Sequence, residues 1–188
     1  MMNSQEYFLD KTERNLLLKI SRESLDLYLK SGRYPDYNTN DFSESLKVRT
    51  GVFVSIYVEE ALRGCIGRMS SELPLYMLVQ KMTISAATSD TRFKLVKNSD
   101  LKNSRIEVSV LTPMIRINDI SVIELGKHGI YIKEGYHSGT FLPQVGENSK
   151  WTVEEFLGHC SRDKAGIGWD GWKTAEIWIY ETIILKEA

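Results

Sequence analysis

An arginine, a cysteine and two glycines occupy five consecutive positions with one isoleucine inside ALRGCIGR, residues 61–68. If this segment is a strand, its two-residue period places Arg63, Cys65 and Gly67 on one face and Gly64 on the other. A nearby guanidinium favours the thiolate form of a cysteine, and the missing side chain at Gly67 would leave space beside the sulfur. The pattern indicates a small pocket for an anionic substrate, with Cys65 as a nucleophile or an acid/base thiol and Arg63 as the orienting cation.

The same residues also fit a structural interpretation. Free cysteine is among the most frequently buried residue types, Arg63 could pair with a carboxylate, and glycines within strands often mark bulges. Gly64 would then let another element pack closely behind the strand. Packing statistics alone favour this interpretation by about two to one.

Three further polar residues lie where side chains often contact substrates. Arg92 follows a predicted helix end together with Asp90, although a simple salt bridge or cap explains that pair equally well. His137 lies in a glycine-bounded turn, where an exposed imidazole could act as a general base but is more often only a surface group. Gln144 follows Pro143, which excludes a regular central strand, so its amide could face a cleft or simply cap an edge strand.

Hydrophobic periodicity and capping residues predict the elements that hold these candidates. Glu59-Glu60 is poor chemistry for a tight turn, yet the chain is expected to reverse there. We expect a helix from the Asp10 cap to Gly32, a polar loop over 33–45, strands 52–58 and 61–66, a helix from Pro74 to Ser89-Asp90, strands 106–111, 129–133 and 140–145 with a turn at 135–139, a helix from the Thr152 cap to Gly166, and a strand over 176–185. This order, without a repeat or a linker, predicts one α+β or mixed α/β domain over residues 1–188.

Composition narrows the function classes. The 188 residues include 24 Lys and Arg against 25 Asp and Glu, so the net charge of −1 gives no broad field for nucleic acid or anionic membrane. The first residues lack a signal-like apolar run, and no stretch of about 20 apolar residues occurs, so we expect a cytoplasmic protein with no membrane association. Cys65 and Cys160 are then expected to be free thiols.

Metal and phosphate motifs receive little support. His128, His137 and His159 are 9 and 22 positions apart, and neither cysteine belongs to a C-x-x-C pair. The glycine-rich segment at 166–171 follows a predicted helix instead of opening one, which is typical of a C-cap and turn. We therefore expect no metal and no cofactor.

Several motifs occur in the order found in the AMMECR family, which this chain resembles over residues 12–185. They are LRGCIG (62–67), AATSDTRF (86–93), VSVLTP (108–113), HGIYI (128–132), SGTFLPQV (138–145) and the WTVEEFL and KAGI segments within 151–167. The chain departs from the common pattern at Leu95, where proline is frequent, and at Arg68, where a small residue is frequent. Arg68 therefore changes the expected polarity at the pocket edge.

The resemblance implies an α/β fold of two unequal lobes, with a mixed or antiparallel sheet flanked by helices and a cleft between the lobes beside the hexapeptide. It also implies Memo-like and radical-SAM partner proteins, because bacterial members belong to the AmmeMemoRadiSam system, whereas the reaction stays open. The resemblance raises the odds that the Cys65 face is functional to about two in three, which reverses the preference that packing statistics alone gave.

Three functions remain open from the sequence. The first is a cofactor-independent enzyme using Cys65, Arg63 and His137, with Gly64, Gly67, Arg92 and Gln144 binding an unidentified small molecule. The second is a non-catalytic ligand-binding or adaptor protein. A nucleic-acid-associated regulator ranks last because of the charge balance, and the sequence leaves a homo-oligomer open.

Overall fold

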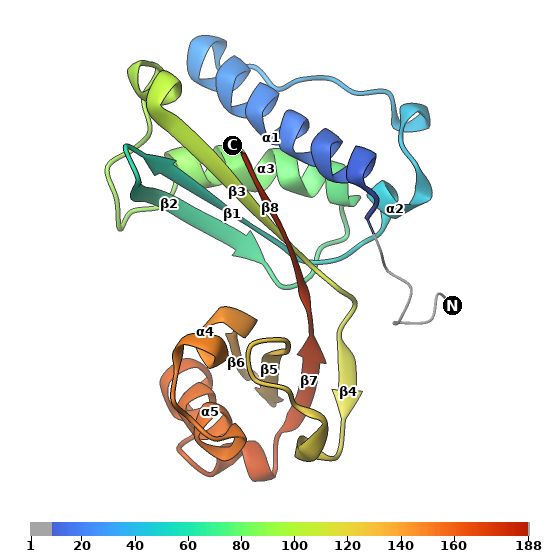
Figure 1. Ribbon diagram of the computed structural model, residues 1–188, viewed down its shortest axis with the longest axis vertical. Helices are drawn as coiled ribbons and strands as arrows, with labels where there is room; N and C mark the ends of the chain where they lie inside the picture. Colours follow the sequence, from blue (N-terminus) through green and yellow to red (C-terminus); the bar gives the residue numbers. More distant parts are fainter. Residues whose placement is uncertain (1–8, 188) are drawn as a thin grey trace. The chain divides into compact units, whose positions relative to one another are not determined.

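The computed structural model describes residues 9–187, which form two compact units (Figure 1). Unit 1 contains residues 9–111 and 183–187, and unit 2 contains residues 112–182. Each unit has a four-stranded sheet, with strand order β2-β1-β3-β8 in unit 1 and β4-β7-β5-β6 in unit 2. The predicted mixed α/β class, with antiparallel sheets flanked by helices, is confirmed.

The elements follow the chain in a simple order. In unit 1 they are α1 (Lys11–Ser31), η1 (Thr39–Asp41), α2 (Glu44–Lys47), β1 (Val52–Val58), β2 (Ala61–Arg68), α3 (Leu75–Thr88), η2 (Asn98–Asn103), β3 (Ser104–Leu111) and β8 (Thr182–Lys186). In unit 2 they are β4 (Ile115–Ile117), η3 (Ile120–Val122), β5 (Gly129–Glu134), β6 (His137–Phe141), α4 (Pro143–Asn148), α5 (Val153–Cys160), η4 (a π-helical turn, Ser161–Ala165), η5 (Gly171–Lys173) and β7 (Glu176–Tyr180).

Helix α1 begins and ends as its sequence predicts. Asp10 accepts a hydrogen bond from the Glu13 amide, and the Glu13 carboxylate accepts one from the Asp10 amide, which completes a capping box. Gly32 ends the helix in the left-handed conformation, with φ of 70°. Among residues 9–187, no helix is both long and apolar enough to cross a membrane.

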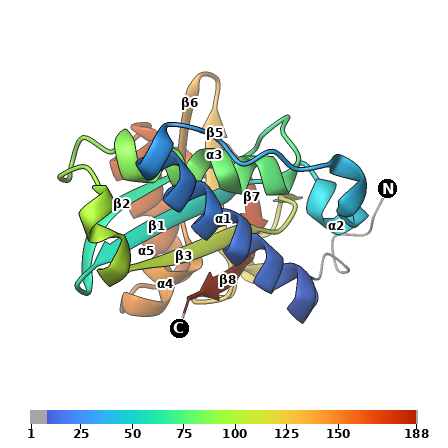
Figure 2. The ribbon, with the colours of Figure 1, turned by 90° about the horizontal axis from the view of Figure 1, so that it is seen from above.

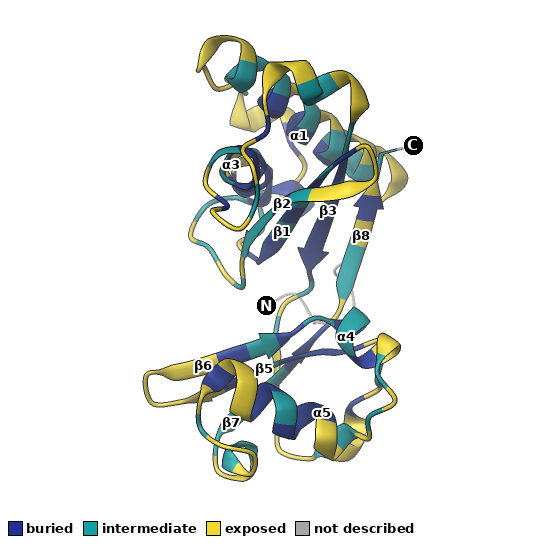
Figure 3. Ribbon diagram, turned by 90° about the vertical axis from the view of Figure 1, so that its left-hand side faces the viewer, coloured by how far each residue is buried: buried dark blue, intermediate teal, exposed yellow. Residues whose placement is uncertain are grey.

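Helices α1 and α3 cover one face of the unit 1 sheet (Figure 2). In β1, Val52, Val54 and Ile56 are fully buried in the core that these helices share with the sheet. The alternate residues, Phe53 and Ser55 among them, are only half-buried on the opposite face (Figure 3). This opposite face, called the open face below, is the one without α1 and α3.

The reversal between β1 and β2 occurs at Glu59 and Glu60, as expected. Both residues have positive φ, at 51° and 65°, which is the backbone of a type I′ hairpin turn and is unusual for glutamate. Asn103 stabilises the turn, since its carbonyl accepts from the Glu59 amide at 3.1 Å and its side-chain amide donates to the Glu59 carboxylate at 3.3 Å. Residues outside the hairpin therefore compensate for its poor turn chemistry.

In unit 2, α5 has the predicted Thr152–Glu155 capping box and packs Phe156 and Leu157 against the sheet.

Two of the predicted strands, over 140–145 and 176–185, differ in extent from the observed strands. The strand predicted over 140–145 ends at Phe141, because Pro143 lacks an amide hydrogen and starts helix α4 instead. The turn between β5 and β6 is correspondingly shorter than predicted, since β6 already begins at His137.

The segment predicted as one strand over 176–185 forms two strands. β7 belongs to the unit 2 sheet and β8 to the unit 1 sheet. Between them, the Glu181 amide donates to the Thr112 hydroxyl at 2.8 Å, and the Glu181 carbonyl accepts from the Thr112 amide at 2.9 Å. Continuous hydrophobicity therefore does not reveal that the chain changes sheet.

The contact between β2 and α3 leaves no space for a side chain at Gly64, because a Cβ there would lie 2.0 Å from the Ala86 carbonyl oxygen. Both atoms are fixed by regular backbone, so Gly64→Ala should lower the free energy of unfolding by about 3 kcal/mol. Urea unfolding followed by circular dichroism measures this loss. Ser85→Ala, one residue from Ala86, should change it by less than about 0.5 kcal/mol. Equal effects of the two substitutions would contradict the close approach.

Candidate functional site

Cys65 lies on β2, an edge strand of the unit 1 sheet, and is half-buried. It pairs with Ser55 of β1, and Gly67 pairs with Phe53, so both follow the alternation that the sequence predicts. Since Ser55 and Phe53 belong to the open face, the Cys65 side chain lies on that face too. The thiol is therefore not enclosed in the core between the sheet and the helices.

The Asp90–Arg92 pair holds the backbone of Cys65 from outside the sheet. The Cys65 amide donates to Asp90 Oδ2 at 2.9 Å, and Arg92 Nη2 donates to the Cys65 carbonyl at 2.9 Å. Arg92 also forms two side-chain hydrogen bonds with the Asp90 carboxylate, of 2.9 and 2.7 Å. The two side chains thus occupy hydrogen-bonding positions that a further strand would use, and we call this arrangement the edge clamp.

Ionisation of the pair strengthens the edge clamp. The hydrogen bonds from the Arg92 side chain hold the pKa of Asp90 far below its usual value, and the Cys65 and Arg92 amides act in the same direction against the effect of burial. The hydrogen bond to Asp90 likewise raises the pKa of Arg92. The Asp90 side chain is only 3% exposed whereas that of Arg92 is 64% exposed, so the clamp presents a solvated cation beside Cys65.

A row of polar side chains crosses the open face from Cys65. Ser55 of β1 lies opposite Cys65, and Glu107 of β3 lies opposite Ser55. Because the amide and carbonyl of Cys65 both bond to the clamp, the Cys65–Ser55 pair is of the type without backbone hydrogen bonds, whose side chains lie closest. The Glu107 side chain is 17% exposed, and its carboxylate forms an ion pair with Lys186 Nζ at 3.1 Å. A thiol, a hydroxyl and a carboxylate therefore lie side by side on one surface.

Arg63 does not take part in the regular pairing between β1 and β2. The register between β1 and β2 shifts, so that Ile56 pairs with Gly64 and Tyr57 with Leu62, which leaves Arg63 unpaired in a bulge. Its guanidinium lies 3.9 Å from the Asp100 carboxylate. The regular pairing on which the predicted alternation depends is therefore interrupted at Arg63, and the cation bonded to Cys65 is Arg92.

Gly64 and Gly67 are each explained by a different close contact. Gly64 faces α3, as predicted, and its close contact with Ala86 leaves it buried. Gly67 does not leave open space, because a Cβ there would meet the Phe53 ring at 2.3 Å and the Val52 carbonyl at 2.4 Å. The expected gap beside the sulfur is therefore occupied on this side by the Phe53 ring.

His137 and Gln144 belong to unit 2, whereas Cys65, Arg63 and Arg92 belong to unit 1. His137 is exposed and begins β6, opposite Glu134 of β5, and not in a turn. Gln144 lies in α4, and its Oε1 atom is buried with no hydrogen-bond partner among the described residues. The predicted site residues are therefore divided between the two units.

The second cysteine contrasts with the first. Cys160 is fully buried in the unit 2 core, and burial raises the pKa of its thiol to about 12. Within residues 9–187, no group of three or more His, Cys, Asp or Glu side chains could hold a metal ion. The chemically accessible thiol of the described chain is that of Cys65.

Sequence reasoning singled out Cys65 and Arg92 but did not connect them. It weighed a binding role for Asp90 and Arg92 against a cap or salt bridge, and it omitted Ser55 and Glu107 altogether. The available signal was a polar residue at a single position of each strand: Ser55 in an otherwise apolar strand, and Glu107 in IEVSVL. Their adjacency to Cys65 depends on strand pairing, which periodicity does not determine.

The two sheets and the edge-strand thiol define a two-unit α/β protein, and comparison with known proteins agrees. The crystal structure of uncharacterized protein PH0010 from Pyrococcus horikoshii matches with a TM-score of 0.79 and 33% identity, over 92% of this chain and 90% of that one. Proteins of Methanosarcina mazei and Nanoarchaeum equitans are each 35% identical, covering 95% and 91% of this chain and 94% and 98% of their own lengths.

The AMMECR1 family profile matches residues 18–185. The chain therefore belongs to the AMMECR1 family, as its ordered motifs indicated. Within unit 1, the edge clamp joins two of those motifs, because LRGCIG supplies Cys65 and AATSDTRF supplies Asp90 and Arg92.

The depressed pKa of Asp90 predicts an acid-dependent loss of stability. Because the folded-state pKa lies below the unfolded value of about 3.8, the contribution of Asp90 is present above that pH and is lost as the pH falls below it. Asp90→Asn should cost about 2 kcal/mol at pH 7 and less at pH 3, since at pH 3 the unfolded wild-type chain gains a proton on Asp90 that the folded clamp does not take up. Urea unfolding at both pH values measures the difference.

Asp36→Asn is the matched control, because Asp36 is an exposed carboxylate with no ion pair in the described chain. It should change the free energy of unfolding by less than about 0.5 kcal/mol at either pH. A cost for Asp90→Asn that is the same at pH 3 and pH 7 would show that ionisation of Asp90 does not contribute to the clamp.

Proposed function

We propose that this AMMECR1-family protein binds a small anionic molecule on the open face of unit 1 and acts on it through the Cys65 thiolate. One observation carries the proposal: the edge clamp fixes both backbone groups of a half-exposed cysteine and places a largely solvated arginine beside it. A fixed nucleophile next to a cation is the arrangement that covalent thiol chemistry on an anionic substrate requires.

In this proposal, the Cys65 thiolate adds to an electrophilic double-bonded carbon of the bound molecule. The sulfur–carbon bond forms as the π electron pair moves to the neighbouring atom, which takes a proton from water, so no group has to leave. Arg92 attracts the negative charge of that molecule, and it takes the role that the sequence assigned to Arg63. Ser55 and Glu107 line the same surface and provide hydrogen-bonding groups for the ligand.

Memo-like and radical-SAM partner proteins remain part of the proposal on the strength of the family resemblance. Affinity purification of the tagged protein from its own cells tests this, followed by mass spectrometry of the captured proteins. Recovery of neither partner class under gentle conditions would remove this part of the proposal and leave the thiol chemistry untouched.

Two alkylating reagents of similar size and different charge test the site. Iodoacetate is anionic and iodoacetamide is neutral, so the ratio of their rates at Cys65 reports the local positive charge. Arg92→Gln should lower this ratio about threefold, because an exposed charge contributes a fraction of a kcal/mol to about 1 kcal/mol. Arg92→Lys should retain most of the ratio. Intact-mass and peptide mass spectrometry measure the labelling.

Two controls make the result specific. Arg63→Gln should leave the ratio unchanged, since Arg63 pairs with Asp100, and Cys160 should stay unlabelled in the folded protein because it is fully buried. A Cys65 thiol that reacts only after denaturation would exclude the nucleophile. A larger effect of Arg63→Gln than of Arg92→Gln would return the cationic role to Arg63.

A non-catalytic ligand-binding or adaptor role is the alternative, and it predicts a different result for Cys65→Ser. If the protein only presents a ligand, this variant keeps ligand binding and its function in cells. If Cys65 reacts, the variant binds the ligand but forms no product.

A further inference from the structure

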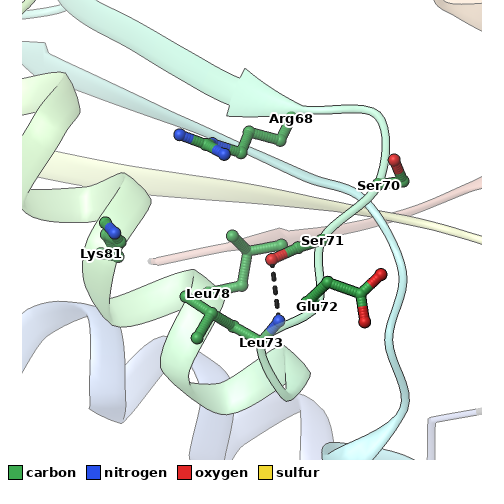
Figure 4. Close-up of a pocket in the computed structure, with 7 residues that line it drawn as sticks. All are labelled: Arg68, Ser70, Ser71, Glu72, Leu73, Leu78 and Lys81. Atoms are coloured by element: carbon green, nitrogen blue, oxygen red, sulfur yellow. Dashed lines mark hydrogen bonds between the residues drawn. The ribbon is translucent and has the colours of Figure 1, made fainter.

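A pocket of unit 1 lies beside the end of β2 and the first turns of α3 (Figure 4). Its volume is about 360 Å³, near the lower end of the range for small-molecule sites. The pocket is lined by two cations, Arg68 and Lys81, by Ser70 and Glu72 of the connecting loop, and by Leu73 and Leu78.

The pocket is separate from the Cys65 surface. Arg68 pairs with Val52, whose side chain is fully buried under the helices, whereas Cys65 pairs with Ser55 on the open face. Arg68 therefore belongs to the helix-covered side of the sheet, at the far end of β2 from the hairpin. Ligand binding here would not occupy the surface beside the thiol.

The charges of this pocket are not balanced. The described residues give no ion pair or hydrogen bond to the side chain of Arg68 or of Lys81, and Figure 4 shows both on the same side of the pocket. Glu72 points away from them (Figure 4) and pairs with Arg49 at 3.0 Å. Two cations therefore face one region of the pocket without a neutralising carboxylate, which favours an anion there.

Polar and apolar groups surround these cations. The Ser70 hydroxyl has no hydrogen-bond partner in the described chain, and the Ser71 hydroxyl accepts from the Leu73 amide at 3.0 Å while its own hydrogen remains available to donate. Leu73 is half-buried and offers apolar surface to the pocket, whereas Leu78 is fully buried in the core behind it. The pocket can thus donate hydrogen bonds to a charged group and pack a short carbon chain.

We propose that this pocket binds a phosphate monoester carrying a short apolar group. A dianionic phosphate matches two unpaired cations, since a guanidinium can bind two of its oxygens and an ammonium acts as a second point charge. The Ser71 hydroxyl is available to donate to a third oxygen, and the ester carbons contact Leu73. This assignment goes beyond the proposed chemistry at Cys65 and does not depend on it.

Ethyl phosphate and ethyl sulfate test the proposal, because they have the same shape but carry two charges and one. Isothermal titration of the full chain at pH 8 and constant ionic strength should show saturable binding of ethyl phosphate, about tenfold tighter than ethyl sulfate. Inorganic phosphate should bind more weakly than ethyl phosphate, because it lacks the carbons that contact Leu73. Succinate tests whether a dicarboxylate satisfies the same cations.

Arg68→Gln and Lys81→Gln should each weaken ethyl phosphate binding about tenfold, since each removes a charge-assisted contact. Lys11→Gln, at an exposed lysine on α1, is the matched control and should leave binding unchanged, and thermal unfolding should be the same for all three variants. Cys65→Ser should also bind ethyl phosphate normally, which separates this site from the thiol site.

Several results would overturn the proposal. They are absence of saturable binding, equal affinity for ethyl sulfate, tighter binding of succinate, or an equal loss in Lys11→Gln. Loss of alkylation at Cys65 with intact phosphate binding would reject the proposed function alone, and the reverse result would reject this inference alone.

Discussion

The edge clamp is the interaction on which the candidate site depends. An edge strand exposes backbone amides and carbonyls that would otherwise bond to water or to another chain. Here Asp90 and Arg92 bond to both backbone groups of Cys65 and to each other, so one ion pair closes the edge and fixes the thiol-bearing residue. Because Asp90 is buried, its charge requires Arg92, and the cation beside Cys65 is therefore also a structural requirement.

The edge clamp also holds Cys65 in a way that leaves its sulfur free to react. A residue held only through its side chain could lose its position when that side chain reacts. Cys65 is held through its backbone, so its sulfur can form a bond without disturbing the contacts that position it. The bulge at Arg63 contributes to the same arrangement, because it ends the regular pairing just before the clamped residue.

Local signals in the sequence predicted most of the fold, and long-range contacts limited the rest. The capping boxes of α1 and α5 and the end of α1 at Gly32 are encoded within a few residues, so these features were predicted correctly, whereas the strand over 52–58 was predicted without its alternation. The exchange of sheets within 176–185 and the helix after Pro143 depend on neighbours distant in the chain. At the site, alternation correctly placed Cys65, but it could not reveal the bulge that moves Arg63 toward Asp100.

The paired hydrogen bonds between Thr112 and Glu181 have a consequence for how the chain is divided between the two units. β3 and β8 are neighbours in one sheet, yet unit 2 is the segment of chain that joins them. Its entry and exit meet at these two residues. Unit 2 is thus a single excursion of the chain between two adjacent strands, with its two ends joined by hydrogen bonds. A direct connection from Thr112 to Glu181 would therefore leave all four strands of the unit 1 sheet, including the strand that carries the thiol, in one continuous chain.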